Sequence, residues 1–523
     1  MRAPEKKPCD GALFWLRYCA AVVMIFFSSC SVAAEWSVVP RLSLWETYSD
    51  NIRLGRVSGD RDDFVTQINP GVTVNGTARR FNLDASYMMN NLIYAKSDDL
   101  SRMRHQLAAK GTAELYEDWF FVDGRAAITQ QNISPLGPQA IDNVNVTGNR
   151  ADVKTYSVSP YLRHRVQDFA SGEVRYTRNY VNSNANALFN SHGDSVSANL
   201  SSGTAFPVFR WGLSYSNQMI TFDRTGRTVE LERSIANLGY RVTSQFSLTA
   251  TGGYERNSFI SIQNKHSSPT WTVGFIWMPS ERTNIIANAG QRFFGDTYFV
   301  QASHRTRLMV WDASYDENIT TFNQQAQQGG GAAIANSLSQ LLAAQNPGMS
   351  PELIQQNAGA LLGLGLSGAF FDPNNFFTNR LFLQKRLQAS VAMNGSKNTV
   401  VLRAFNMTRN ALSAASDDFG LFGAANAALL SHTRQTGGNA LWSYRLTNLT
   451  RANLNFGYTR YAFLGVNRED DHMLVRLSLS RQFPEIMRNL TGVVEVRHNQ
   501  RDSNQPGANY RENGVVLALN MTF

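Results

Sequence analysis

The stretch Val515-Val516-Leu517-Ala518-Leu519-Asn520-Met521-Thr522-Phe523 places a large apolar residue at every second position. Successive side chains of a β-strand point to opposite faces, so this spacing puts the apolar residues on one face. The same period of two recurs along the chain, for example in the apolar sets Met473-Val475-Leu477-Leu479 and Trp271-Val273-Phe275-Trp277. The repetition predicts an all-β protein.

Alternation alone does not separate a soluble β-sandwich from a membrane barrel, because both have one apolar face. Two features favour the barrel. The segments run for about 10–13 residues, whereas strands of soluble sheets most often have about five or six. Many segments also begin or end in Tyr, Trp or Phe, as the interfacial girdles of outer-membrane barrels do. Since a bilayer leaves no unpaired backbone group tolerable, the sheet must be closed.

The connections between the segments alternate between short and long. Short turns fall near residues 76–80, 116–118, 167–170, 206–209, 243–245, 279–283, 447–450 and 483–488. Longer loops fall near residues 46–62, 132–152, 182–192, 258–268, 411–433 and 500–510. Outer-membrane barrels have short periplasmic turns and long outer loops. We therefore predict a transmembrane antiparallel up-and-down β-barrel of about 22 strands (18–22), with both termini on the periplasmic side.

The composition agrees with an exported protein. Of the 523 residues, 43% are hydrophobic and only 17% are charged, and the three cysteines, Cys9, Cys19 and Cys30, all lie near the start. The basic residues and apolar run of residues 1–34 predict a cleaved signal peptide, which leaves residues 35–523 as the barrel. Lipidation of Cys30 is an alternative reading of the same segment. A disulfide scaffold and a thiolate zinc site are excluded downstream of it.

The formal net charge of +9 is scattered, with no run of Lys or Arg. This pattern, in an exported chain, argues against a nucleic-acid partner.

One long segment, residues 321–375, breaks the strand pattern. It contains no Lys or Arg, and its only acids are Glu352 and Asp372. Ser350-Pro351-Glu352 is typical of a helix start, which predicts a helix from Leu353 to Leu362. An uncharged, partly apolar outer loop is expected to pack on something, either as a lid or plug in the barrel mouth or as a cap on neighbouring loops.

No catalytic or metal-binding motif is evident, so we expect no enzyme and no cofactor. The eight histidines are scattered singly, whereas a metal site needs clustered ligands. Ser191-His192 and Ser431-His432 are adjacent pairs, but neighbours on a strand point to opposite faces and do not make a triad. Acidic loops such as Ser416-Asp417-Asp418 are compatible with calcium or sugar binding, or with plain solvation.

The charged residues inside the strands are the best candidates for function. If the apolar face meets lipid, these side chains point into the lumen, since Lys or Arg facing lipid costs about 2–4 kcal/mol at the midplane. Bases outnumber acids in this set, which favours anionic solutes, unless the charges only brace the wall across strands. The predicted lumen-lining residues are Lys110, Glu114, Asp123, Arg125, Arg163, Arg165, Glu173, Arg175, Arg241, Glu255, Arg292, Arg386, Arg445, Arg476, Glu495 and Arg497.

Several phrases resemble those of the PEP-CTERM system-associated outer membrane protein family, and the resemblance spans nearly all of residues 35–523. The phrases are Thr47-Tyr48-Ser49-Asp50-Asn51-Ile52, Asp63-Phe64-Val65-Thr66, Asn69-Pro70-Gly71-Val72, Pro279-Ser280-Glu281-Arg282-Thr283, Gly290-Gln291-Arg292-Phe293-Phe294-Gly295, Trp311, Tyr315-Asp316-Glu317, Arg497-His498 and Tyr510-Arg511-Glu512-Asn513. The resemblance implies a Gram-negative barrel linked to an exosortase sorting system and to exopolysaccharide genes, and it assigns no catalytic residue. The terminal Phe523 also resembles the signal read by the barrel-assembly machinery.

Three hypotheses follow. The first is an outer-membrane pore or accessory for export of exopolysaccharide or exosortase-sorted surface material. The second is a non-conducting structural or binding barrel that anchors surface glycan or protein. The third and least favoured is an outer-membrane hydrolase, for which His192 and His432 would be the histidines to test. A siderophore-type transporter is disfavoured because the strand pattern already begins between Trp36 and Trp45, where such proteins carry a plug domain.

Overall fold

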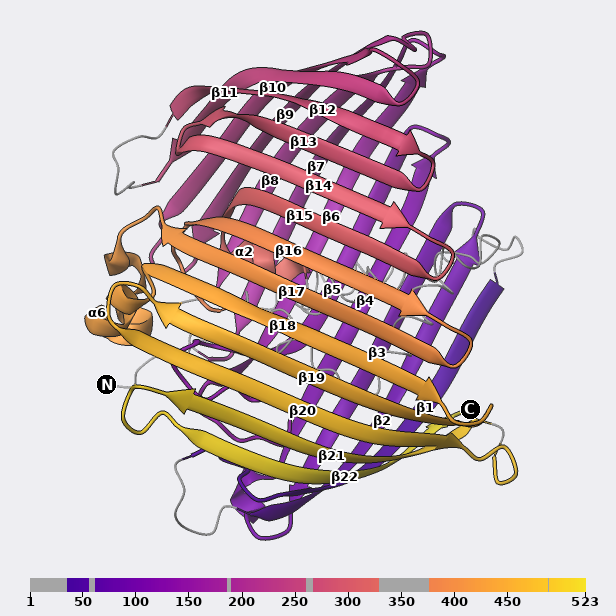
Figure 1. The fold of residues 1–523 in the computed structure, drawn as a ribbon, viewed down its shortest axis with the longest axis vertical. Coiled ribbons are helices and arrows are strands. Elements are labelled where there is room, and N and C mark those ends of the chain that lie inside the picture. The colour runs from indigo at the N-terminus through magenta and orange to yellow at the C-terminus, as the bar shows by residue number, and fades with distance from the viewer. Residues whose placement is uncertain (1–34, 56–61, 186–189, 260–266, 329–375, 488) are drawn as a thin grey trace, which may run out of the picture.

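The chain forms one closed antiparallel barrel of 22 strands (Figure 1). The computed structural model describes residues 35–55, 62–185, 190–259, 267–328, 376–487 and 489–523. Each strand pairs with the next along the chain, and the first and last strands close the sheet, from Arg41↔Thr522 to Ser49↔Gly514. A closed sheet has no free edge, so every strand has a backbone partner on both sides.

The strands are long and follow one another without a crossover. Their bounds are β1 Glu35–Ser49, β2 Asp63–Ala78, β3 Phe81–Tyr94, β4 Arg102–Tyr116, β5 Phe120–Asn132, β6 Arg150–Val166, β7 Ala170–Ser183, β8 Ser191–Ser202, β9 Phe209–Phe222, β10 Thr228–Arg241, β11 Phe246–Ser258, β12 Ser267–Ser280, β13 Thr283–Arg292, β14 Gly295–Arg305, β15 Met309–Thr320, β16 Phe382–Asn394, β17 Asn398–Ala411, β18 His432–Arg445, β19 Thr450–Phe463, β20 Arg468–Gln482, β21 Leu490–Ser503 and β22 Tyr510–Thr522. Among the described residues, four short helical segments lie between strands: η1 Asp98–Leu100, α2 Phe322–Gln328, η3 Ala415–Asp418 and α6 Phe419–Leu429.

The two ends of the barrel differ. At one end, here the turn end, the connections are short, such as the turns after β2, β4 and β16. At the other, the loop end, most connections are longer and include η1, α2, η3 and α6 (α6 lies at the left in Figure 1). β1 starts and β22 finishes at the turn end.

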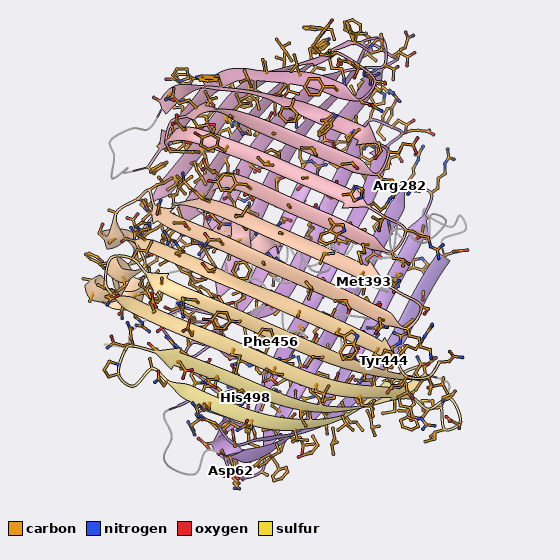
Figure 2. All side chains as sticks on the ribbon, in the orientation of Figure 1. Asp62, Arg282, Met393, Tyr444, Phe456 and His498 are labelled. Atoms are coloured by element: carbon orange, nitrogen blue, oxygen red, sulfur yellow. The ribbon has the colours of Figure 1, made fainter. Side chains whose placement is uncertain are left out.

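The two faces of the wall differ as sharply. In β21 and β22 the paired residues Val496 and Val515 are 47% and 41% exposed, and their neighbour Arg497 is only 4% exposed. On β19 the exposed apolar face carries Phe456, which Figure 2 shows near the middle of the wall. An apolar outer surface around a closed sheet is the architecture that spans a bilayer.

Aromatic side chains mark both edges of the apolar belt. Trp119, Phe209, Tyr240, Trp277, Trp311 and Trp442 are exposed near the turn end. Phe64, Tyr180, Tyr254, Trp271 and Tyr298 are exposed near the loop end. Amphipathic rings at two levels are typical of the two membrane–water interfaces. Among the described residues, no helix is both long and apolar enough to cross a membrane.

The predicted barrel class, its count of about 22 strands and the alternation of short and long connections are confirmed. The predicted signal peptide and the predicted helix from Leu353 to Leu362 lie outside the described residues. Within residues 321–375, the structure describes α2 and its preceding residue.

The expectation of helix in a single loop was incomplete, because the loop between β17 and β18 also contains α6. This helix escapes a periodicity test since it is apolar on all sides and is interrupted at Gly423, where φ is +75°.

Candidate functional site: the inner wall and its folded-in loops

The pairing register puts the sixteen charged strand residues on one face of the wall. They share the face opposite the exposed apolar belt, as Arg497 and Glu495 do beside Val496. The same holds along the rest of the set: Lys110, Glu114, Asp123, Arg125, Arg163, Arg165, Glu173, Arg175, Arg241, Glu255, Arg292, Arg386, Arg445, Arg476, Glu495 and Arg497. The structure does not bring them together as one site, and two groups of them differ in their surroundings.

The first group lies in the loop-end half and is paired. Arg497 Nη2 lies 2.7 Å from Glu512 Oε1, and both side chains are almost fully buried. Arg292 Nε lies 2.8 Å from Glu255 Oε1, and Arg476 Nε lies 3.9 Å from Glu495 Oε1. These pairs support the reading in which inner charges brace the wall.

The second group lies in the turn-end half and faces open space. Arg125, Arg163, Arg165 and Arg241 are exposed. Within the described part of the chain, none of these four guanidinium groups has an ion pair with a carboxylate. Arg210, which the sequence analysis did not single out, lies on the same inner face and is exposed as well. This half also holds paired charges, since Arg175 pairs with Asp123 and Glu173 and Lys110 pairs with Asp84, and the exposed guanidinium groups add unpaired positive charge to it.

The loop between β5 and β6, residues 133–149 (the inner loop), folds back onto the inner face of the wall. Arg501 on β21 donates to Gly137 O at 2.7 Å and to Leu136 O at 3.1 Å. Arg468 on β20 donates to Leu136 O at 3.2 Å. Since β20 and β21 are several strands away from β5 around the barrel, the inner loop reaches across the loop-end lumen.

Ion pairs and polar contacts hold the tip of the inner loop. The Asp142 carboxylate pairs with Arg497, and Asn145 Nδ2 donates to Glu512 Oε1 at 3.0 Å. Burial alone would raise the pKa of Asp142, but the guanidinium groups of Arg497 and Arg476 hold this pKa below its ordinary value. Asp142 is therefore ionised when the loop is in place, and it is compensated by bases of the wall.

A second segment packs beside the inner loop. The Phe322 and Phe377 rings stack with centroids 4.5 Å apart, and Phe377 N donates to Ile133 O at 2.9 Å. α2 reaches the inner face of β8 and β9, because Asn323 donates to Ser191 Oγ at 3.1 Å and Gln324 donates to Gln218 Oε1 at 2.7 Å.

The loop that contains η3 and α6 packs on this segment, and the Asp418 carboxylate makes the contact. Asp418 accepts hydrogen bonds from Thr378 Oγ1 at 2.6 Å and from Asn379 N at 2.7 Å. Burial raises the pKa of Asp418 to about 6, against the hydrogen bonds from Thr378 and Asn379, which lower it. The buried Arg380 donates to Ser413 O at 2.9 Å and to Ala427 O at 3.1 Å, which fixes the same contact.

The pattern of connections predicts residues 132–152 only as a long loop, although their sequence also carries a signal for an inward path. From residue 126 to residue 149 the only charged side chain is Asp142, and Ile133, Ile141 and Val144 are apolar. The test that singled out residues 321–375, an uncharged and partly apolar loop, would also have found this one. Ile141 and Val144 are buried.

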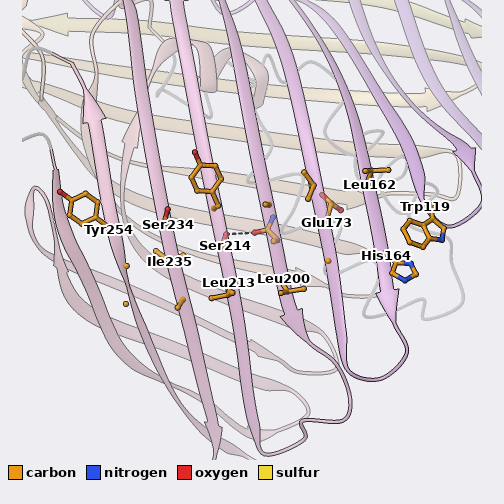
Figure 3. Close-up of a pocket in the computed structure, with 18 residues that line it drawn as sticks. Trp119, Leu162, His164, Glu173, Leu200, Leu213, Ser214, Ser234, Ile235 and Tyr254 are labelled. Atoms are coloured by element: carbon orange, nitrogen blue, oxygen red, sulfur yellow. Dashed lines mark hydrogen bonds between the residues drawn. The ribbon is translucent and has the colours of Figure 1, made fainter.

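One pocket, of about 730 Å³, lies on the outer face instead (Figure 3). Small residues on neighbouring strands, such as Gly172, Ala198 and Ala236, form its floor between Leu162 and Leu213. At the edge nearest the turn end, the Trp119 and His164 rings stack with centroids 3.8 Å apart. Because this groove belongs to the apolar belt, it faces lipid and does not line a path for solutes.

The adjacent Ser–His pairs do not form dyads where their contacts are described. Ser191 Oγ accepts from Asn323 on the inner side of the wall, whereas His192 Nδ1 lies 2.7 Å from Asp223 Oδ1. Among the described residues, no three His, Cys, Asp or Glu side chains are grouped as a metal site. That the chain is not an enzyme stays a prediction.

No family model and no curated protein matches the chain. The chain is similar to the siderophore receptor PirA from Pseudomonas aeruginosa, at 10% identity, with 92% of this chain and 80% of the receptor covered and a TM-score of 0.44. It is similar to the ferric-catecholate import receptor Fiu from E. coli K12, at 10% identity, with 93% and 82% covered and a TM-score of 0.47. It is also similar to OpdK from Pseudomonas aeruginosa, at 8% identity, with 93% and 99% covered and a TM-score of 0.35.

Proposed function

We propose that the chain is an integral outer-membrane channel for export of exopolysaccharide or of exosortase-sorted surface material. The observation that carries the proposal is the division of the inner wall. Its turn-end half exposes arginines without carboxylate partners, and its loop-end half is narrowed by folded-in segments. A charged inner surface selects ions of the opposite sign, so the lumen favours anions.

The two ends of the barrel support a direction for the export. Outer-membrane barrels keep short turns on the periplasmic side and long loops outside. On that rule the exposed arginines lie at the periplasmic end, where an exported polymer would enter. The inner loop then narrows the lumen at the outer end, where the polymer would leave. The resemblance to the PEP-CTERM-associated family supplies the link to exopolysaccharide and sorted surface protein.

The second candidate is a non-conducting structural barrel that anchors surface glycan or protein. The observation that favours it is the tight fixing of the inner loop by Arg497, Arg501 and Arg468. On this reading the buried ion pairs hold the inner loop in place permanently, so that it always constricts the lumen.

Single-channel recording in planar bilayers separates the two candidates. We expect the full chain to conduct with a reversal potential that reports anion preference. Replacing residues 134–148 of the inner loop by a short Gly-Ser linker is expected to raise the conductance at least about twofold, because the loop crosses the loop-end lumen.

A matched control shortens the loop between β12 and β11, which the sequence predicts to lie outside, and is expected to leave the conductance unchanged. Absence of conductance from both the full chain and the inner-loop variant would reject the channel and leave the structural barrel.

A further inference from the structure

Four exposed bases of the inner wall lie on the neighbouring strands β4, β5 and β6. Arg163 and Arg165 lie on the inner face of β6 close to the turn end, Arg125 lies farther along on β5, and Lys110 lies on β4. All four side chains are exposed. We call these four residues the basic track.

Two members of the basic track stand directly opposite each other. Lys110 pairs with Arg125 in the register of β4 and β5. Like charges at opposed positions destabilise a sheet, and Asp84 offsets only the charge of Lys110. Asp84 lies 3.2 Å from Lys110 Nζ, but Arg125 has no ion pair within the described parts of the chain.

Aromatic rings orient the guanidinium groups nearer to the turn end. The Arg163 guanidinium lies 4.7 Å from the centroid of the Phe121 ring, and the Phe121 and Tyr161 rings stack at 5.1 Å with an interplanar angle of 14°. Tyr161 also contacts a second guanidinium, that of Arg175, which lies 3.7 Å from the centroid of the Tyr161 ring. A guanidinium over the face of a ring can still donate its N–H groups to a carboxylate or phosphate.

Strands β20 and β21 offer no such surface. On β20 and β21 the guanidinium groups of Arg476, Arg497 and Arg501 are buried, and Arg497 and Arg501 bond to the inner loop and to wall carboxylates. Other exposed inner arginines, such as Arg210, Arg241 and Arg445, lie close to the turn end, whereas on β4–β6 the exposed bases also extend from the turn end toward the inner loop.

The spacing of the basic track fixes the shape of its ligand. At about 3.3 Å per residue, Arg163 and Arg165 are roughly 7 Å apart along β6. Arg163 N bonds to Trp119 O, six residues before Arg125, so these two levels are separated by roughly 20 Å. A small anion can contact either Arg163 or Arg125, but not both. A polymer with repeated negative groups can contact both residues at once and therefore binds with higher affinity.

We infer that the basic track binds a linear polyanion that carries a carboxylate on successive units, such as an acidic polysaccharide. This inference rests on the proposed function, since it names the class of polymer that the channel would carry. The polymer would lie along β4–β6 with its carboxylates on Arg163, Arg165, Arg125 and Lys110. It would meet the inner loop at the loop end, where Arg102 donates to Asn143 O at 3.1 Å.

The test is calorimetric titration of the full chain in detergent with oligogalacturonate of defined length. A track variant, Arg125→Gln/Arg163→Gln/Arg165→Gln, is expected to bind at least about tenfold more weakly, given the modest worth of each exposed ion pair. Neutral dextran of similar length is expected not to bind. The interaction should weaken as salt is raised.

A matched control replaces three other exposed inner arginines, Arg210→Gln/Arg241→Gln/Arg305→Gln, and is expected to change the dissociation constant less than about twofold. Equal binding by the track variant and the full chain would overturn the inference, as would equal loss in both triple variants. All proteins must show the gel-mobility shift on heating that marks a folded barrel.

Conductance of the same preparations keeps the two proposals apart. If oligogalacturonate binds through the basic track but no preparation conducts, the export channel is rejected and the polyanion site stands. If the chain conducts and oligogalacturonate does not bind, the polyanion site is rejected and the channel stands.

Discussion

Arg497 is the residue on which the position of the inner loop most depends. Its guanidinium joins Asp142 of the inner loop to Glu512 of β22, and its side chain is 1% exposed. A buried ion pair adds little net stability, but removing one partner leaves the other charge buried without compensation. The inner loop is therefore held by a group that is costly to delete.

We predict that Arg497→Met releases the inner loop. The loss of one partner of a buried pair typically costs about 3–5 kcal/mol, and here two carboxylates are left. Hydrogen exchange of the amides of residues 139–146 is expected to accelerate by at least about a hundredfold. The control Arg125→Met removes an exposed base and is expected to leave the exchange rates of these amides unchanged. Equal exchange rates in Arg497→Met and in the unmodified chain would contradict the role assigned to Arg497.

Asp418 gives the folded-in segments a dependence on pH. Its pKa of about 6 in the packed state lies above the ordinary value of about 3.9, so the packed state retains a proton that an exposed carboxyl has lost. The contribution to stability is complete below about pH 4 and is lost as the pH rises through 6. The total change is of the order of 3 kcal/mol.

We predict that the contact of Asp418 with Thr378 and Asn379 is tighter at pH 5 than at pH 8. Exchange of the Asn379 amide, corrected for the intrinsic effect of pH, is expected to be slower at pH 5. Asp418→Asn, which is neutral at both values, should abolish the difference. A difference of the same size in Asp418→Asn would show that another group is responsible.

At the scale of single residues, the sequence predicted the face of each charged side chain but not its partner. The face follows from the period of two, which is local. The partner of Arg497 lies 355 residues away at Asp142, and nothing local specifies that contact. For the same reason the sequence separated neither the paired group from the exposed group nor the inner loop from the outer ones.

Strands are the elements in which the two environments meet, and β4 shows this most simply. Ala108 and Ala109 are neighbours near its middle, and they differ only in the face they occupy. Ala109 pairs with Ala126 on the outer face, whereas Ala108 is exposed on the inner face with Lys110. The same substitution at Ala108 and at Ala109 therefore compares the inner face of the wall with the outer face.

We predict opposite outcomes for one substitution at these two positions. Ala109→Arg is expected to destabilise the barrel by about 2–4 kcal/mol, the cost of an arginine facing lipid near the midplane. Ala108→Arg is expected to change stability by no more than about 0.5 kcal/mol. Reversible urea unfolding in lipid vesicles measures both, and equal destabilisation would contradict the assignment of faces.

Elements other than strands were harder to predict. The strand pattern is repeated in every segment, so the barrel and its count of strands could be predicted from the sequence. α6 could not, because an apolar helix interrupted at Gly423 carries no periodic signal. The path of the inner loop depends on β20–β22, which are distant in sequence, although its lack of charge pointed to burial.

The whole barrel has an apolar outer belt and a charged inner wall. Its two ends differ in the length of their connections, which are short at the turn end and mostly longer at the loop end. The export channel and the polyanion site both require that the belt meets hydrocarbon and that the inner wall meets water. A barrel packed with its apolar face against protein would remove that requirement and both proposals with it.

A nitroxide scan along β4 tests this claim most directly. The cysteines of the chain are Cys9, Cys19 and Cys30, so single cysteines can be placed at residues 105–112 once these three are replaced. In lipid vesicles, labels at 105, 107, 109 and 111 are expected to be most accessible to dissolved oxygen, and labels at 106, 108, 110 and 112 to a water-soluble nickel chelate. The absence of alternation, or the opposite phase, would contradict the account.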